Sequence, residues 1–134
     1  MIAEHKRLMK LLIKFNAQPQ RTFPSVRARL EVPNTHGVYM IRDRAGRVWH
    51  VGRTVRGKDG LRQRLRNHLQ GQSSFVRTAM DGDGSKLRKG FTFQYIEVPD
   101  DRTRALLECL AVGTNCPRHI GLGRRLAADP QTVP

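Results

Sequence analysis

Apolar residues recur with helical spacing at the beginning of the chain. Within residues 1–16, four apolar side chains follow the i, i+3, i+4, i+7 pattern: Leu8, Leu11, Leu12 and Phe15. Basic residues occupy several of the positions between them, so the pattern predicts a basic amphipathic helix. Residues 17–35 contain three prolines and no sustained period, which predicts a linker.

The hydrophobic period changes to two at Gly37. Two short apolar runs, Gly37–Arg42 and Arg47–Arg53, are separated by four residues that include Gly46, a spacing typical of a β-hairpin. Helical spacing then returns twice before another alternating run, and a last apolar segment precedes Pro117. The expected elements are helices over 61–70, 73–80 and 101–113 and a third strand over 91–98.

These elements predict an α+β fold with a small three-stranded, largely antiparallel sheet flanked by helices. We expect three regions: a basic helix and linker over 1–33, a globular domain over 34–123 and a flexible tail over 124–134. A chain of 134 residues has room for one domain and a short extension. The two cysteines, Cys109 and Cys116, lack CxxC spacing and are expected to be buried free thiols.

The net charge and its distribution say more about the class of binding partner than the hydrophobic content does. The chain carries 25 Lys and Arg against 11 Asp and Glu, a net charge of +14. Half of that excess lies between Arg42 and Arg66, where nine bases and two acids give +7. Such a concentration points to a polyanionic partner, most often nucleic acid. No apolar run approaches the ~18–20 residues of a membrane span, so we expect no membrane association and a cytoplasmic location.

Several side chains are candidates for chemistry, each with a simpler alternative. On the expected helix 61–70, Arg64 and His68 lie on one flank of the leucine stripe, where they either face a cleft or are merely exposed. Tyr39 lies on a strand and would more often be part of the core. Glu108 falls within the most apolar helix of the chain, where a carboxylate needs a salt bridge or a metal ion.

The order of these residues resembles the GIY-YIG nuclease family. Gly37-Val38-Tyr39 is followed by His50-Val51-Gly52, and then by Arg64, His68, Glu108 and Pro117. The resemblance covers about residues 34–120, and it includes the order of the strands and helices. It implies hydrolysis of DNA phosphodiester bonds.

Roles for individual residues follow from the resemblance. It implies that Tyr39 activates a water, alone or with His68, and that Arg64 contacts the scissile phosphate. It also implies that Glu108 holds one divalent metal ion, Mg²⁺ or Mn²⁺. A bidentate arginine and a metal ion are suited to phosphoryl transfer because both stabilise the developing negative charge.

The sequence departs from the family pattern at two positions. His50 stands where the second motif usually has tyrosine, and it is either a catalytic substitute or a sheet histidine. Ile120 stands at the spacing of the usual asparagine, and Asn115 could replace it only after a register shift. The departure at Ile120 motivates an alternative function, a nucleic-acid-binding module that keeps the fold and has lost turnover.

The remaining candidates are contacts to DNA phosphates. They lie in the loop after the hairpin, on the helix 61–70 and just beyond it: Arg53, Arg56, Lys58, Arg62, Arg66 and Gln72. The sequence identifies no recognition domain, so target specificity is expected to be low, to be supplied by residues 1–33, or to come from a homodimer or a partner protein.

Overall fold

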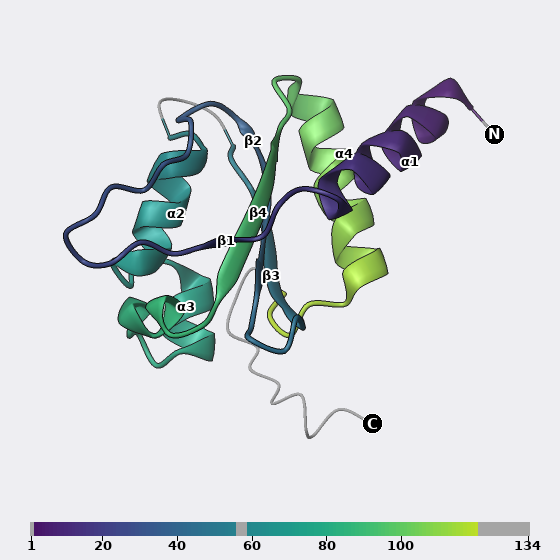
Figure 1. The fold of residues 1–134 in the computed structure, drawn as a ribbon. Coiled ribbons are helices and arrows are strands. Elements are labelled where there is room, and N and C mark those ends of the chain that lie inside the picture. The colour runs from purple at the N-terminus through teal and green to yellow at the C-terminus, as the bar shows by residue number, and fades with distance from the viewer. Residues whose placement is uncertain (1, 56–58, 121–134) are drawn as a thin grey trace, which may run out of the picture.

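The computed structural model describes residues 2–55 and 59–120 of the chain (Figure 1). Their elements are, in order, α1 (Ala3–Asn16), β1 (Arg21–Thr22), β2 (Gly37–Arg42), β3 (Val48–Arg53), α2 (Leu61–Leu69), α3 (Ser74–Ala79), the 3₁₀ helix η1 (Gly84–Arg88), β4 (Thr92–Glu97) and α4 (Asp101–Asn115). The predicted α+β class is confirmed, and most predicted elements begin and end within two residues of their expected positions. The tail 124–134 lies outside the described residues.

The sheet has four strands rather than the three predicted. All neighbouring strands are antiparallel, in the order β1-β4-β2-β3. The additional strand, β1, is two residues long and pairs Arg21 with Phe93 and Thr22 with Thr92. It was not predicted because two exposed residues in a proline-containing linker carry no periodic signal.

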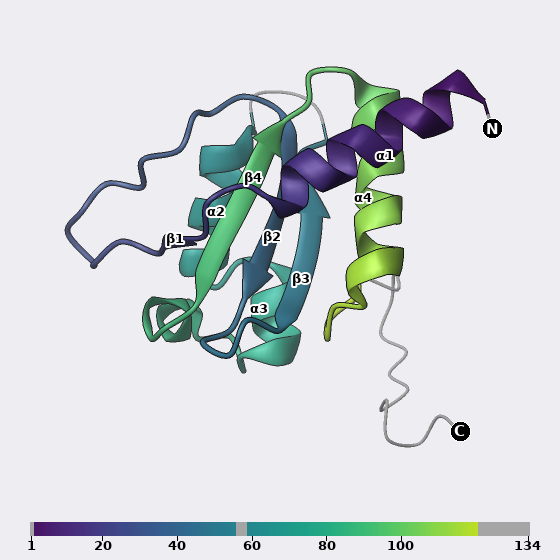
Figure 2. The same cartoon turned by 45° about the vertical axis from the view of Figure 1, so that its right-hand side comes forward.

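Helices cover both faces of the sheet (Figures 1 and 2). On one face, α1 and α4 pack together, and the apolar stripe of α1 is buried through Leu8, Leu12 and Phe15. On the other face, α2 and α3 pack with β2 and β4 around a second core that includes Tyr39 and Ile41. The sheet therefore separates two apolar cores, and Tyr39 belongs to the core beneath α2.

The expectation for the cysteines was wrong. Cys109 and Cys116 are both free, as predicted, but both are exposed. Cys109 lies on the outer side of α4, and Cys116 caps that helix with a left-handed φ of 46°. When most sides of a helix are apolar, the sequence does not show which side packs against the core and which side is exposed.

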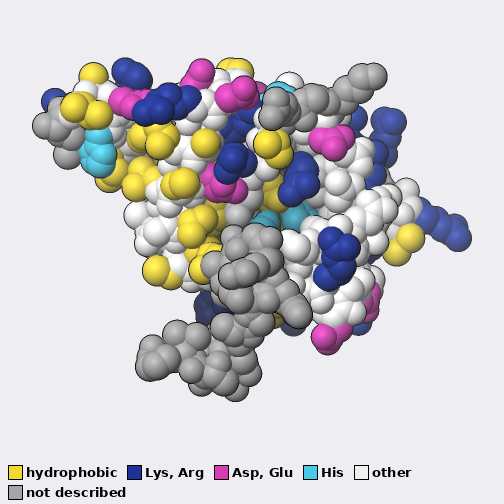
Figure 3. Space-filling model, turned by 180° about the vertical axis from the view of Figure 1, so that it is seen from behind, with side chains coloured by type: hydrophobic (Ala, Val, Ile, Leu, Met, Phe, Trp, Pro, Cys, Tyr) yellow, Lys and Arg dark blue, Asp and Glu magenta, His cyan; other side chains and the backbone are white. Residues whose placement is uncertain are grey.

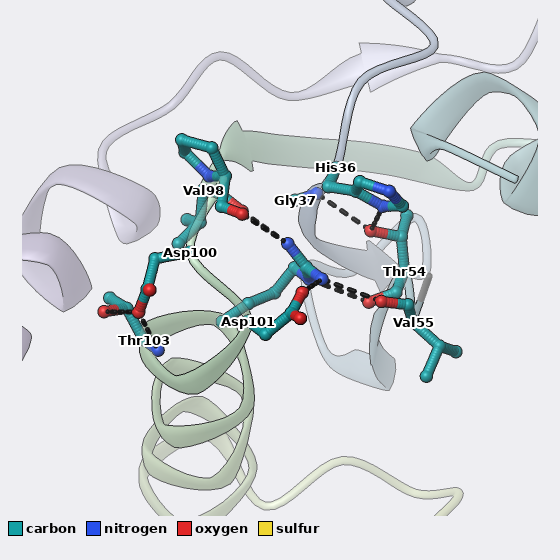
Figure 4. A network of polar contacts seen from close by, with 10 residues as sticks. His36, Gly37, Thr54, Val55, Val98, Asp100, Asp101 and Thr103 are labelled. Carbon is teal, nitrogen blue, oxygen red and sulfur yellow. Dashed lines mark hydrogen bonds and ion pairs between the residues drawn. The ribbon is translucent and has the colours of Figure 1, made fainter. Parts of the chain in front are cut away.

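A buried arginine joins α4 to the ends of two strands. The side chain of Arg104 is 1% exposed, and its guanidinium donates to the carbonyl oxygens of Thr54, Val55, Val98 and Pro99 and pairs with Asp101. Figure 4 shows this network, in which the Thr54 hydroxyl also accepts from the backbone N–H of Gly37. The network fixes the beginning of β2, two residues before Tyr39.

We expect Arg104→Met to destabilise the fold by about 3–5 kcal/mol, because several buried carbonyl groups lose their donor. Thermal and urea unfolding measure the change. Arg102→Met on the same helix is the matched control, since Arg102 forms an exposed pair with Glu4. Equal stability of the Arg104 variant and the parent would contradict a structural role for Arg104.

Candidate active site

Tyr39 lies at the centre of the candidate site and is completely buried. Its hydroxyl is 2.6 Å from Nε2 of His68 and 3.4 Å from Nε2 of His50. Gly52, opposite Tyr39 in the β2–β3 ladder, makes room for this arrangement. A Cβ atom at Gly52 would lie 2.5 Å from the Tyr39 hydroxyl oxygen, so the glycine of the second motif is required by close approach.

His68 is held from both sides of its ring. Its Nε2 meets Tyr39, and its Nδ1 is 2.6 Å from the hydroxyl oxygen of Ser73. Ser73 is the N-cap of α3 and accepts the backbone N–H of Val76 at 3.2 Å. Because a hydroxyl oxygen can accept two hydrogen bonds, Ser73 can hold the Nδ1–H of His68 and leave Nε2 free to accept the proton of Tyr39.

His50 joins the cluster through stacking and hydrogen bonding. Its ring stacks on Phe75, with centroids 4.6 Å apart and an interplanar angle of 8°. Its Nδ1 lies 3.2 Å from Nδ1 of His119, while its Nε2 faces Tyr39. The structure thus brings Tyr39, His50 and His68 together.

His119 belongs to this cluster and was not predicted. The backbone N–H groups of Arg118 and His119 donate to the carbonyl oxygens of Val48 and Trp49, so this segment runs along β3. That pairing carries the His119 ring to His50. The family spacing pointed to this stretch of the sequence, but it placed the expected asparagine at Ile120, one residue after His119.

Among the described residues, three other positions considered from the sequence form no hydrogen bond with the cluster. The Asn115 amide donates to the carbonyl oxygen of Ala111 in its own helix, so no register shift brings it to Tyr39. Gln72 is exposed. Ile120 is 49% exposed and carries no polar side-chain atom.

Arg64 and Glu108 supply charge beside the cluster. Among the described residues, the buried Nε of Arg64 has no hydrogen-bond partner, as expected for a guanidinium whose ligand is a bound anion. Glu108 pairs with Arg53, which is the salt bridge considered from the sequence. The two side chains are 21% and 35% exposed, so a ligand can reach the pair. In Figure 3, histidine side chains lie in a hollow between basic and acidic side chains.

Burial keeps the cluster uncharged at neutral pH. Desolvation raises the pKa of Tyr39 to about 12, although Arg64 acts in the opposite direction. Desolvation lowers the pKa of His68 to about 3, and the charge of Arg64 lowers it further. Burial also lowers the pKa of His50. Tyr39 therefore keeps its proton in the resting site, and His68 is neutral there, with a ring nitrogen free of a proton.

These shifts predict that acid destabilises the protein. Unfolded His68 binds a proton near its usual pKa of 6.5, whereas folded His68 does so only near 3. The contribution of His68 to stability is therefore complete above pH 6.5 and falls by about 1.4 kcal/mol for each pH unit below it, and the lowered pKa of His50 acts in the same direction. Urea unfolding between pH 7 and pH 4 tests this expectation. His68→Gln should reduce the slope of stability against pH, while His50 keeps part of it, and an unchanged slope would contradict the expectation.

Comparison with known proteins identifies the family. A family described as the GIY-YIG catalytic domain matches residues 35–111, more than half of the chain. The chain belongs to the GIY-YIG family. The chain is also 30% identical over 88 residues to the UvrABC system protein C of Caldicellulosiruptor saccharolyticus. That match covers 66% of this chain and 13% of the longer protein.

The residues of this GIY-YIG domain fit one weakly coordinated divalent ion. In the described part of the chain, no three His, Cys, Asp or Glu side chains form a group that could hold a metal ion. Mg²⁺ keeps most of its waters, so one carboxylate together with substrate phosphate can suffice, and Glu108 is the carboxylate that would hold such an ion.

The other predicted nucleic-acid contacts have different locations in the GIY-YIG domain. Arg56 and Lys58 lie outside the described residues. Arg62 and Arg66 are on the flank of α2 away from Arg64. Within residues 2–55 and 59–120, no helix is long and apolar enough to cross a membrane.

Proposed function

We propose that this chain is a divalent-metal-dependent endonuclease that hydrolyses DNA phosphodiester bonds. The observation that carries the proposal is the hydrogen bond between Tyr39 and His68, with the guanidinium of Arg64 beside it, whose buried Nε has no hydrogen-bond partner among the described residues. The GIY-YIG family and the net charge of +14 support a nucleic acid as the substrate.

Tyr39 and His68 provide a route for the proton of the attacking water. Tyr39 takes a proton from water while it gives its own proton to Nε2 of His68, which Ser73 holds through Nδ1. This transfer avoids a free phenolate, whose formation burial makes costly. His50, between Tyr39 and His119, orients the hydroxyl from the other side.

Arg64 and Glu108 act on the phosphate. Arg64 would bind the scissile phosphate, which satisfies its buried Nε and stabilises the added negative charge. Glu108 would hold the one divalent ion, Mg²⁺ or Mn²⁺. When bound, that ion supplies positive charge to the phosphate and its leaving oxygen.

A second candidate function is a nucleic-acid-binding module without turnover. Ile120 favours it, because this exposed side chain offers no hydrogen bond at the position where the family usually has asparagine. We propose a cytoplasmic location for either activity. We also propose that target choice depends on a homodimer or a partner protein.

Incubation of the pure protein with supercoiled plasmid distinguishes the two functions. The nuclease converts plasmid to the nicked form with Mg²⁺ or Mn²⁺ and not with EDTA. Electrophoretic mobility of labelled DNA at several salt concentrations is measured in parallel. Salt-dependent binding with no metal-dependent nicking would reject the nuclease and favour the binding module.

A further inference from the structure

A second basic surface lies on the other side of α2 from the candidate site. The chain segment 24–33 runs beside α2 and leaves a groove of about 710 Å³ between them. Four arginines and one acid contribute charge to its lining: Arg29, Arg62, Arg66, Arg88 and Glu31. We call this groove the α2 groove. The net charge of the side chains that line it is therefore +3.

The α2 groove and the active site use opposite flanks of one helix. Arg64 and Arg62 are two residues apart, which places their side chains about 160° apart around the helix axis. Arg66 lies one turn beyond Arg62 on the groove side, and His68 lies one turn beyond Arg64 on the active-site side. A single phosphate therefore cannot contact both Arg64 and Arg66.

Two of the arginines are fixed to the groove wall. Nε of Arg62 donates to the carbonyl oxygen of Val32 at 2.9 Å, and Nε of Arg88 donates to that of Pro24 at 2.8 Å. These bonds hold segment 24–33 against the domain and leave both terminal guanidinium nitrogens of each arginine without a partner among the described residues. Arg29 and Arg66 are exposed and make no ion pair within the described part of the chain.

We propose that the α2 groove binds backbone phosphates of the nucleic acid, away from the phosphate that is cleaved. The proposal rests on the proposed function, since it takes the same DNA as ligand. Guanidinium groups suit phosphates because their planar donors pair with two oxygens at once. Four such groups in one groove can bind more than one phosphate, and the two fixed arginines lose little freedom on binding.

The test is the salt dependence of DNA binding, measured in EDTA so that turnover does not enter. A labelled duplex of three helical turns is titrated with the parent and with Arg29→Gln/Arg66→Gln. Loss of two phosphate contacts should weaken binding and reduce the log–log salt slope by about 2. Both positions are exposed, so thermal melting should show an unchanged fold.

Arg44→Gln/Arg77→Gln is the matched control. It removes the same charge from two exposed arginines outside the α2 groove, one in the β2–β3 turn and one on α3. This control should keep a salt slope close to that of the parent. Equal slopes for the groove variant and the parent, or equal losses in both variants, would overturn the proposal.

Competition with polyglutamate separates nucleic acid from an acidic protein ligand. DNA should displace polyglutamate from the parent at a far lower concentration than polyglutamate needs to displace DNA. Tighter binding of polyglutamate than of DNA would also overturn the proposal. Because binding alone is measured, failure of the nuclease activity leaves this test interpretable.

Discussion

Tyr39→Phe is expected to reduce metal-dependent plasmid cleavage by about 10²- to 10⁴-fold, the usual contribution of a general acid–base group. The substitution removes only the hydroxyl that lies 2.6 Å from His68, so no proton can pass from water to the imidazole. The phenyl ring keeps its place in the core beneath α2. Initial rates of nicking at saturating Mg²⁺ measure the effect.

Tyr95→Phe is the matched control for Tyr39→Phe. Tyr95 is paired with Tyr39 across the β2–β4 ladder and lies outside the histidine cluster. The Tyr95→Phe variant should cleave plasmid at the parental rate, and both variants should bind DNA as the parent does. If Tyr39→Phe nicks plasmid as fast as Tyr95→Phe, Tyr39 does not carry the proton and the proposed mechanism is wrong.

Glu108→Ala is expected to abolish metal-dependent nicking, because the site loses its only proposed protein ligand for the ion. DNA binding should stay the same or tighten, since the change removes a negative charge and releases Arg53 for a phosphate. The ion pair is partly solvated, with Arg53 35% exposed. Its loss should therefore cost only about 0–1 kcal/mol of stability.

Two measurements complete the Glu108→Ala experiment. Melting curves show whether the stability change stays small, and titration with Mn²⁺ shows whether excess metal restores cleavage. Glu97→Ala, which removes an exposed carboxylate near the end of β4, should nick plasmid normally. A Glu108→Ala protein that nicks at the parental rate would show that Glu108 holds no catalytic ion.

The parts of the site that lie on periodic helices and strands could be predicted from the sequence. Helical periodicity placed Arg64 and His68 on one flank of α2, and strand periodicity placed Tyr39 within the first strand of the hairpin. That this strand turns Tyr39 toward α2 is seen only in the structure. The partner of Glu108 could not be deduced in the same way. Arg53 and Glu108 are 55 residues apart, and only the packing of α4 against β3 brings them together.

The electrostatic character of the site also depends on tertiary structure. Near its usual pKa of 6.5, His68 would be a ready base, but burial with Arg64 lowers that pKa to about 3. Burial raises the pKa of Tyr39 in the same cluster. Neither effect can be deduced from residue type, because both come from exclusion of water by groups distant in the sequence.

The pairing of Arg118 and His119 with β3 has a consequence for solubility. β3 is the last strand on its side of the sheet, so its outer backbone groups would be open to pairing with another molecule. Arg118 and His119 occupy the carbonyl oxygens of Val48 and Trp49 on that edge. The guanidinium of Arg118 also lies over the Trp49 ring, 4.1 Å from its centre, and places a charge there. Arg118 and His119 thus protect this edge from edge-to-edge aggregation, and His119 also completes the histidine cluster.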